Sequence, residues 1–315
     1  MSSFLKLIRF PNLLMIAFVQ YVMRYAVVMP LVNLYGLEFQ LSGFTFFCIV
    51  FSTMCTAAAG YAINDYFDVK ADKINRPGKV VVGRAITRRR TVMTHIILCT
   101  AGILLGGYVT WKAGIPELVL LYILVSGMLW LYSSVYKRLF LIGTVIAALF
   151  SALVPMMALL DIPPMYRFYE QFLLDKGINL NFAIFWILGV AAFAFLTTLS
   201  YEIIKDAEDF EGDAAYGCRS LPIVLGDRYT KWTIIGINTI IIVAFGWVYG
   251  CFHREISGCF SFFYILLLMA VPMVIISWKV YQANTSNDYR RAGNWLKLVM
   301  LAGIVFCGVY PFLFT

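Results

Sequence analysis

The stretch from residue 181 to residue 213 reads NFAIFWILGVAAFAFLTTLSYEIIKDAEDFEGD. Its first part, residues 181–204, is mostly apolar and is long enough to cross a bilayer, because a span needs about 20 such residues. Its last part, residues 201–213, carries six acidic side chains. The stretch therefore predicts a membrane-spanning helix that ends in a cluster of acids.

The composition of the whole chain agrees with a membrane protein. Of its 315 residues 62% are hydrophobic and 13% are charged, and the mean hydropathy is +0.82. Soluble domains are about 45–50% apolar and about 25% charged. These figures exclude a water-soluble globule, a disordered chain, a coiled coil and a disulfide scaffold. We expect an integral membrane protein.

Nine stretches have the length and apolar character of a span. We expect an all-α polytopic membrane protein, a single domain over residues 1–315, with nine transmembrane helices around a central cavity. The expected spans are residues 12–34, 43–63, 91–112, 115–135, 141–160, 181–204, 231–251, 259–281 and 294–314.

The positions of lysine and arginine predict the orientation. With the N-terminus in the cytoplasm, 19 of the 25 basic residues fall in cytoplasmic segments and four fall outside. The other two, Arg24 and Lys297, lie within spans. The net charge of +8 therefore reflects topology and contact with membrane lipids, and we expect no nucleic-acid partner.

Nine of the 17 acidic residues lie in two short windows, at the cytoplasmic ends of the second and sixth spans. The first window, residues 64–72, reads NDYFDVKAD, and the second is residues 201–213. If each helix continues through its window, one face of it carries three regularly spaced polar side chains. Acids at a membrane-buried helix end are costly unless they are paired or bind metal. The two sets are Asn64, Asp68 and Asp72, and Asp206, Asp209 and Asp213.

These residue types favour a magnesium–diphosphate site. Carboxylate oxygens suit Mg²⁺, whereas zinc prefers histidine and cysteine, which are absent at both windows. Basic residues on the same side would neutralise phosphate oxygens. Because the chain has no P-loop and no G-x-G-x-x-G, an isoprenoid diphosphate fits better than a nucleotide. The basic residues are Lys70, Lys73, Arg76, Arg84, Lys137, Arg138, Lys205 and Arg219.

With these motifs the chain resembles the UbiA family of intramembrane prenyltransferases. The first window is similar to that family's N-D-x-x-D-x-x-x-D, and residues 206–213 are similar to its D-x-x-D-x-x-x-D. The sequences LYSSVYKR at residues 131–138 and RFPN at residues 9–12 also resemble family segments. Residues 202–213, followed by RSLPIVLG at residues 219–226, look most like the branch that makes digeranylgeranylglyceryl phosphate.

The resemblance implies a prenyltransferase that transfers alkyl groups other than methyl, with Mg²⁺ as cofactor. Its substrates would be a prenyl diphosphate, such as geranylgeranyl diphosphate, and a membrane-associated acceptor. It would lie in the plasma membrane of a bacterium or archaeon with its active site facing the cytoplasm. The implied catalytic residues are Asp68, Asp72, Asp206 and Asp209; the metal ligands are Asn64, Asp65, Asp68, Asp72, Asp206, Asp209 and Asp213; the diphosphate-binding residues are Arg76, Arg84, Lys137, Lys205 and Arg24; and the acceptor-positioning residues are Tyr132, Tyr201 and Asn12.

Three alternatives stay open at this point. The acceptor is either a geranylgeranylglyceryl phosphate-type lipid, as in ether lipid synthesis, or an aromatic compound of quinone biosynthesis such as a hydroxybenzoate, naphthoate or homogentisate. For Arg24, helix packing is an alternative to phosphate binding. A cation transporter would use intramembrane acids as an ion path, but such acids tend to lie near the midplane and not at helix ends.

Overall fold

The computed structural model describes residues 3–76, 78, 80–251 and 259–309. In this part of the chain the backbone forms helices and short connections, and its only β interaction is an isolated bridge between Val82 and Ile86. The all-α fold predicted from the sequence is therefore confirmed for the described residues.

Nine helical segments of the described chain are long and apolar enough to cross a membrane, which is the number that hydropathy predicts. They are built from α2 (Phe10–Val22), η1 (Met23–Val28) and α3 (Met29–Leu34); α4 (Gly43–Asn75); α5 (Arg88–Lys112); η2 (Pro116–Leu118) and α6 (Val119–Ser134); α7 (Ile142–Met156), η4 (Met157–Asp161) and α8 (Ile162–Phe168); α10 (Asn181–Glu208); α12 (Leu221–Cys251); α13 (Cys259–Tyr264), η5 (Ile265–Ala270) and α14 (Val271–Gln282); and α15 (Ser286–Val309). Shorter helices are α1 (Ser3–Leu7), η3 (Tyr136–Arg138), α9 (Glu170–Lys176) and α11 (Phe210–Ala215).

The chain divides into two compact units. The first comprises Met1–Lys137 and Leu153–Gly189, and the second comprises Arg138–Ala152 and Val190–Thr315. Helices α7 and α10 each begin in one unit and end in the other. The single domain expected over residues 1–315 stays a prediction.

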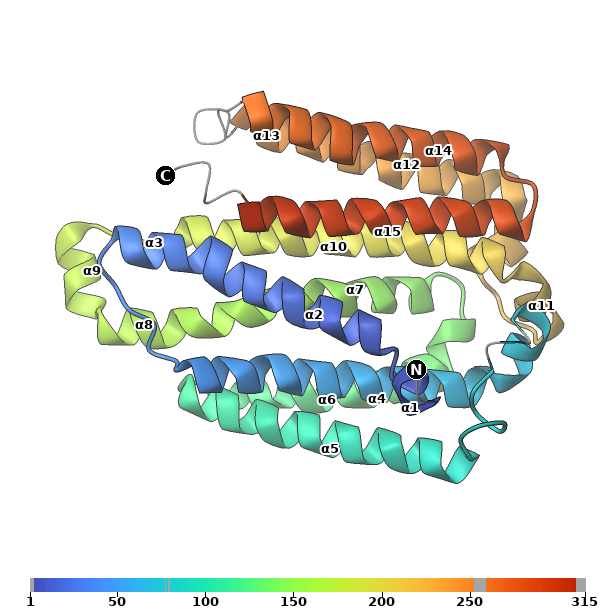
Figure 1. The fold of residues 1–315 in the computed structure, drawn as a ribbon, viewed down its shortest axis with the longest axis horizontal. Coiled ribbons are helices and arrows are strands. Elements are labelled where there is room, and N and C mark those ends of the chain that lie inside the picture. The colour runs from blue at the N-terminus through green and yellow to red at the C-terminus, as the bar shows by residue number, and fades with distance from the viewer. Residues whose placement is uncertain (1–2, 77, 79, 252–258, 310–315) are drawn as a thin grey trace. The chain divides into compact units, whose positions relative to one another are not determined.

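In the first unit, α4, α5 and α6 lie side by side (Figure 1). Two glycines of α5 make this close packing possible. A Cβ on Gly102 would lie 2.5 Å from the Thr56 hydroxyl of α4, and a Cβ on Gly106 would lie 2.6 Å from the Tyr122 ring of α6. Small residues at such contacts let membrane helices approach closely, so larger side chains here would push the helices apart.

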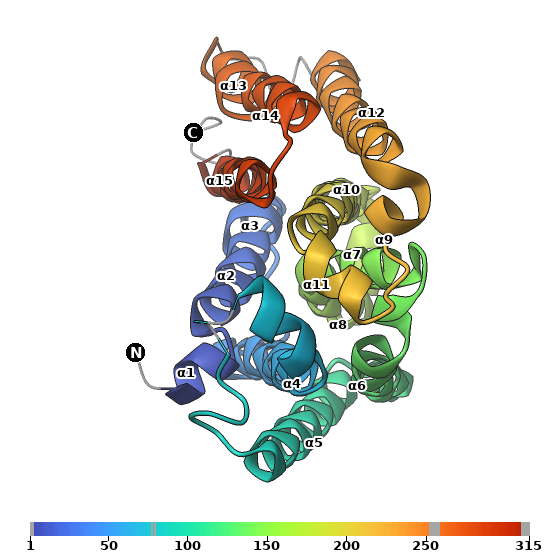
Figure 2. The same ribbon diagram turned by 90° about the vertical axis from the view of Figure 1, so that its right-hand side faces the viewer.

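In the second unit, α12, α14 and α15 follow one another in the packing, as Figure 2 shows, and they share an apolar core with α10. A buried chain of hydrogen bonds also ties three of these helices together. The Ser200 hydroxyl donates to Asn238 Oδ1 at 2.8 Å, and Asn238 Nδ2 donates to Ser277 Oγ at 3.1 Å. Polar contacts of this kind hold membrane helices together because lipid offers no alternative hydrogen-bond partner.

The helices extend beyond the predicted spans where polar residues follow apolar ones. Helix α4 continues from the expected end at residue 63 to Asn75, and α15 begins at Ser286 and not at residue 294. Hydropathy detects only the apolar part of a helix, whereas backbone hydrogen bonds continue into the polar part. The extension of α4 places the whole first acidic window on a helix.

Candidate functional site

The first acidic motif lies at the C-terminal end of α4. The helix runs without a break through Asn64, Asp68 and Asp72, and it closes where the backbone N–H of Arg76 donates to the Asp72 carbonyl oxygen at 2.8 Å. Because the three motif residues are four apart on a continuous helix, they share one face, as their spacing predicts.

Lys137 contacts this face from another part of the chain. It lies in η3, 69 residues beyond Asp68, and its ammonium group forms an ion pair with the Asp68 carboxylate. The Asn64 side-chain amide donates to the same carboxylate at 2.7 Å. The side chains of Asp68 and Lys137 are only 17% and 26% exposed, so this ion pair is partly shielded from water. An acid predicted to bind metal and a lysine predicted to bind diphosphate therefore lie in contact.

Arg9 contacts the first acidic window, although the sequence analysis used Arg9 only to predict the orientation of the chain. Its guanidinium donates to Asp65 at 2.9 Å and lies 4.9 Å from the centre of the Tyr61 ring. Burial by itself lowers the pKa of Arg9, but the neighbouring Asp65 and Tyr61 raise it above its ordinary value, so Arg9 stays charged. Asp65, predicted as a metal ligand, is thus neutralised by Arg9. The RFPN sequence at residues 9–12 was the available signal.

The donor atoms of this face fit a hard cation. Asn64, Asp68 and Asp72 offer amide and carboxylate oxygens, and among the described residues the Asn64 side-chain oxygen is buried and accepts no hydrogen bond. No three His, Cys, Asp or Glu side chains gather closely enough in the described chain to hold a metal by themselves. Oxygen ligands of this kind are the type that Mg²⁺ prefers, and Mg²⁺ usually completes its shell with water and substrate oxygens.

The second acidic motif is not on one continuous helix, which corrects the expectation of a single face. Asp206 is in the last turn of α10, Asp209 lies at the break that follows Glu208, and Asp213 is on the short helix α11. The backbone stays close to helical, because the N–H of Asp209 donates to the Lys205 carbonyl at 2.9 Å and that of Asp213 to the Asp209 carbonyl at 3.1 Å.

The start of α15 holds the end of α10 in place within the second unit. Arg290 Nε donates to Glu208 Oε1 at 2.8 Å, and the Ser286 hydroxyl donates to the Glu208 carbonyl oxygen at 2.8 Å. Glu208 lies between Asp206 and Asp209, so these contacts restrain the backbone that carries the second motif. Sequence reasoning missed Arg290 and Ser286, because no pattern connects residues about 80 positions apart.

Arg24 is a packing residue in this structure. Its side chain is 2% exposed, its Nε lies 3.3 Å from Asp161 Oδ2, and its Nη2 donates to the Leu41 carbonyl at 2.6 Å. The guanidinium also lies within 4.4 Å of the ring centres of Phe39 and Phe46. Phe46 is about 27 Å along α4 from Asn64, at 1.5 Å per residue. Of the two roles considered for Arg24, the contacts show helix packing.

The other residues predicted to bind diphosphate lie near the C-terminal ends of α4 and α10 or in the connection after α4. Arg76 is half-buried at the C-cap of α4, and Arg84 is exposed in the connection between α4 and α5. Lys205 is half-buried on α10, where its ammonium lies 3.4 Å from the Glu202 carboxylate. Their contact with diphosphate stays a prediction.

The residues predicted to position the acceptor are on three different helices. Tyr132 is half-buried on α6, and Asn12 is exposed in the first turn of α2. Tyr201 is half-buried on α10, and the Lys297 ammonium lies 5.0 Å from the centre of its ring. The acceptor role of all three stays a prediction.

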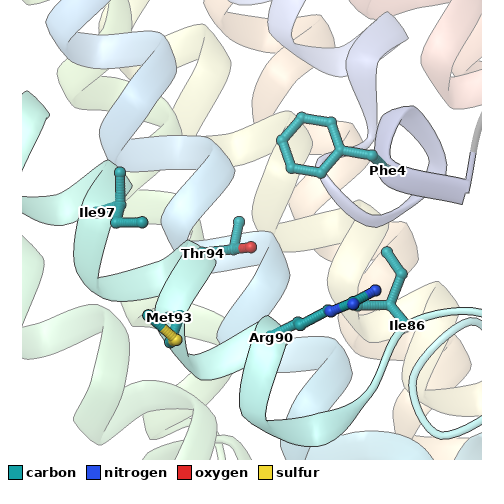
Figure 3. A pocket seen from close by; sticks show the side chains of 6 residues that line it. All are labelled: Phe4, Ile86, Arg90, Met93, Thr94 and Ile97. Atoms are coloured by element: carbon teal, nitrogen blue, oxygen red, sulfur yellow. The ribbon is translucent and has the colours of Figure 1, made fainter.

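A pocket of about 380 Å³ lies beside the start of α5 (Figure 3). Its lining comes from α1, from the connection before α5 and from α5 itself, and it contains one charged side chain, Arg90. No residue of either acidic motif lines it, so we assign it no part in the chemistry. The lining residues are Phe4, Ile86, Arg90, Met93, Thr94 and Ile97.

The chain is similar to known proteins over most of its length. It is 27% identical over 262 residues to the digeranylgeranylglyceryl phosphate synthase of Methanosphaera stadtmanae, covering 82% of this chain and 85% of that protein. Its fold is similar to that of a solved digeranylgeranylglyceryl phosphate synthase, with a TM-score of 0.61, 20% identity and 97% and 98% of the two chains covered. It is also similar to a UbiA homologue from Archaeoglobus fulgidus bound to DMAPP and Mg²⁺, with a TM-score of 0.58, 16% identity and 98% and 100% covered.

A protein-family model also matches most of the chain. Residues 27–301 match the UbiA prenyltransferase family, and both acidic motifs lie inside this range. The nine apolar helical segments found in the described part of the chain are those expected of an integral membrane protein. The chain therefore belongs to the UbiA prenyltransferase family.

Proposed function

We propose that the chain transfers a prenyl group from a prenyl diphosphate to a geranylgeranylglyceryl phosphate-type lipid, in a reaction that requires Mg²⁺. The acceptor is inferred from the name of the Methanosphaera relative, and the donor and metal from the ligands of the Archaeoglobus homologue. The product would be an ether lipid.

The observation that best supports this proposal is the contact between Asp68 and Lys137 beside Asn64. A carboxylate that binds a metal and a cation that binds phosphate oxygens both serve a diphosphate. Here the two are already paired, and Asn64 orients the carboxylate while its own oxygen accepts no hydrogen bond among the described residues. A diphosphate with its metal would separate the Asp68–Lys137 pair and give each side chain its own ligand.

We assign the metal to the two acidic motifs and the diphosphate oxygens to nearby cations. When bound, Mg²⁺ would offset the negative charge that grows on the leaving diphosphate. Asp65 would act through its pairing with Arg9 and not as a direct ligand. The proposed ligands are Asn64, Asp68, Asp72, Asp206, Asp209 and Asp213 for the metal, and Arg76, Arg84, Lys137 and Lys205 for the diphosphate.

In the transfer step the bond between the prenyl C1 and the diphosphate oxygen breaks, and its electron pair leaves with the diphosphate. The acceptor hydroxyl oxygen forms the new bond to C1, and its proton passes to water or to the diphosphate. A dry, apolar site protects the allylic cation from hydrolysis. We assign Lys137 to neutralise the leaving group, and its contact with the Asp68 carboxylate at the end of α4 supports this assignment.

We place the N-terminus and the diphosphate site on the cytoplasmic side of the plasma membrane of a bacterium or archaeon, with the whole chain acting as one domain among membrane lipids. The support is the distribution of basic residues, of which 19 of 25 fall on that side in this orientation. Both acidic motifs then lie at cytoplasmic helix ends. Cysteine-accessibility labelling at Arg84 and at the exposed Asp175 would test the orientation, since the two positions are expected on opposite sides.

The function is tested with the purified chain in lipid vesicles that contain labelled geranylgeranyl diphosphate, Mg²⁺ and one acceptor at a time. Geranylgeranylglyceryl phosphate, 4-hydroxybenzoate and 1,4-dihydroxy-2-naphthoate form the acceptor panel, and mass spectrometry identifies the product. We expect a diether lipid phosphate from the first acceptor. If only the aromatic acceptors were prenylated, the function would instead be a step of quinone biosynthesis. Ion flux without diphosphate release would favour a transporter.

Matched variants test the site. Asp68→Asn and Asp209→Asn are expected to lower the transfer rate at least about a hundredfold, the loss typical when a group that stabilises transition-state charge is removed. Asp175→Asn is the control, because Asp175 is an exposed acid on the short helix α9. Full activity of Asp68→Asn, in protein that elutes like the wild type in detergent, would overturn the metal-site assignment.

A further inference from the structure

Lys297 lies near the start of the apolar part of helix α15. It is eleven residues past Ser286 and three residues inside the span expected at residues 294–314. Its side chain is exposed, and among the described residues no carboxylate pairs with it. A lysine near the end of a span either extends its ammonium group to the membrane interface or faces protein and water along a substrate path.

The neighbours of Lys297 orient its ammonium group without neutralising it. The Nζ atom lies 5.0 Å from the centre of the Tyr201 ring on α10, a cation–π contact. One turn earlier on the same face of α15, a Cβ on Gly293 would lie 3.4 Å from Tyr201, so the two helices are close at this point. The aromatic ring positions the ammonium group but carries no negative charge. The ammonium group can therefore still bind an anion.

The position of Tyr201 relates Lys297 to the second acidic motif. Tyr201 and Asp206 are five residues apart on the continuous helix α10, which corresponds to about 7.5 Å along its axis. Tyr201 is therefore about two helical turns before the C-terminal end of α10, and Asp206 is in the last turn of that helix. Of the cations assigned to the diphosphate, Lys205 is one turn beyond Tyr201 on α10, and Arg76, Arg84 and Lys137 belong to the first unit.

We propose that Lys297, oriented by Tyr201, binds the anionic group of the prenyl acceptor. This inference rests on the proposed function, in which every candidate acceptor carries an anion: a phosphate on the glycerol lipid, or a carboxylate on the hydroxybenzoate and naphthoate. A lysine ammonium offers three donors and a compact charge that suit either group. Binding of the anion would turn the acceptor's nucleophilic atom toward the prenyl C1 of the bound donor.

The test compares anionic and neutral acceptors. Wild type, Lys297→Met and Lys297→Arg are assayed with geranylgeranyl diphosphate and either geranylgeranylglyceryl phosphate or its dephosphorylated form, geranylgeranylglycerol. A second arm replaces these by 4-hydroxybenzoate and its methyl ester. Lys279→Met is the matched control, since Lys279 is a half-buried lysine in the last turn of α14. Elution in detergent checks that each variant folds.

For the preferred anionic acceptor, we expect Lys297→Met to raise the acceptor KM roughly ten- to a hundredfold, the usual effect of losing a charged hydrogen bond. The KM for geranylgeranyl diphosphate should not change, the neutral acceptor should be used as by the wild type, and Lys297→Arg should recover most of the loss. An equal effect on anionic and neutral acceptors, or no change in acceptor KM, would overturn the inference. A wild type that transfers to no acceptor would instead contradict the proposed function.

Discussion

Replacing Asp161 by asparagine is expected to destabilise the protein without touching its chemistry. In the wild type, Asp161 is fully buried and is the carboxylate beside the Arg24 guanidinium, which is 2% exposed. The Asp161→Asn variant keeps the size of the side chain but removes the charge. Among the described residues, Arg24 then keeps the Leu41 carbonyl oxygen and the rings of Tyr25, Phe39 and Phe46 as partners.

The size of the effect follows from this environment. Removing one partner of a buried ion pair costs about 3–5 kcal/mol, because the other charge stays buried. The carbonyl and the aromatic rings still stabilise Arg24, which favours the low end, about 3 kcal/mol. At about 2 °C per kcal/mol for a chain of this size, the apparent melting temperature should fall by about 6 °C.

The assay is the fraction of monodisperse protein left after heating in detergent, measured by size-exclusion chromatography. The Arg24→Met/Asp161→Leu double variant is the informative comparison. Replacing a buried ion pair by apolar side chains is often neutral or stabilising, so the double variant should melt close to the wild type. It should also keep its prenyl transfer rate, because Arg24 packs against the end of α4 that is about 27 Å from the acidic motif.

Two results would refute this reasoning. If Asp161→Asn melts like the wild type, the ion pair does not stabilise the buried guanidinium. If the double variant melts like the wild type but loses transfer, Arg24 contacts a substrate, and the phosphate-binding role considered from the sequence would return.

Three further predictions concern the site and the packing around it. Lys137→Met should raise the KM for geranylgeranyl diphosphate at least about tenfold, because the diphosphate would lose the charged contact that we propose for it; an unchanged donor KM would remove Lys137 from the site. Gly106→Ala should cost about 1–3 kcal/mol and lower the melting temperature, because its Cβ would lie 2.6 Å from the Tyr122 ring, whereas Gly127→Ala, with no neighbour within 4 Å, should not. Chelation by EDTA should stop transfer, and Mg²⁺ but not Zn²⁺ should restore it; activity that survives chelation would contradict the oxygen-ligand site.

The spans were predictable because their physical cause is local. A helix that crosses a bilayer must satisfy its own backbone hydrogen bonds and present apolar side chains for about 20 residues, and both demands are visible in a short window of sequence. The nine expected stretches match the nine apolar helical segments of the described chain for this reason. The helix ends were less predictable, because the end of α4 is set by backbone bonding through polar residues.

The contacts of the site were likewise predictable only where their physical cause is local. The common face of Asn64, Asp68 and Asp72 follows from spacing on one helix, so the sequence was sufficient. The break at Asp209 did not follow, because six acids in 13 residues permit a continuous helix as readily as a helix that ends and a second helix that begins. Pairs that join distant segments, such as Arg9 with Asp65 and Arg290 with Glu208, depend on tertiary packing, which leaves no periodic signal in the sequence.

The two basic residues within the spans show what the structure adds to function. Arg24 and Lys297 are equivalent by hydropathy, since each places a charge among apolar residues and is a candidate functional residue. Their partners distinguish them: Arg24 is buried against a carboxylate, whereas Lys297 is exposed and lies against an aromatic ring. A charge that is already neutralised stabilises the fold, and a charge that is only oriented can still bind an anion. The acceptor assay with Lys297→Met tests whether Lys297 binds an anion. The melting assay with Asp161→Asn tests independently whether the pair of Arg24 and Asp161 stabilises the fold.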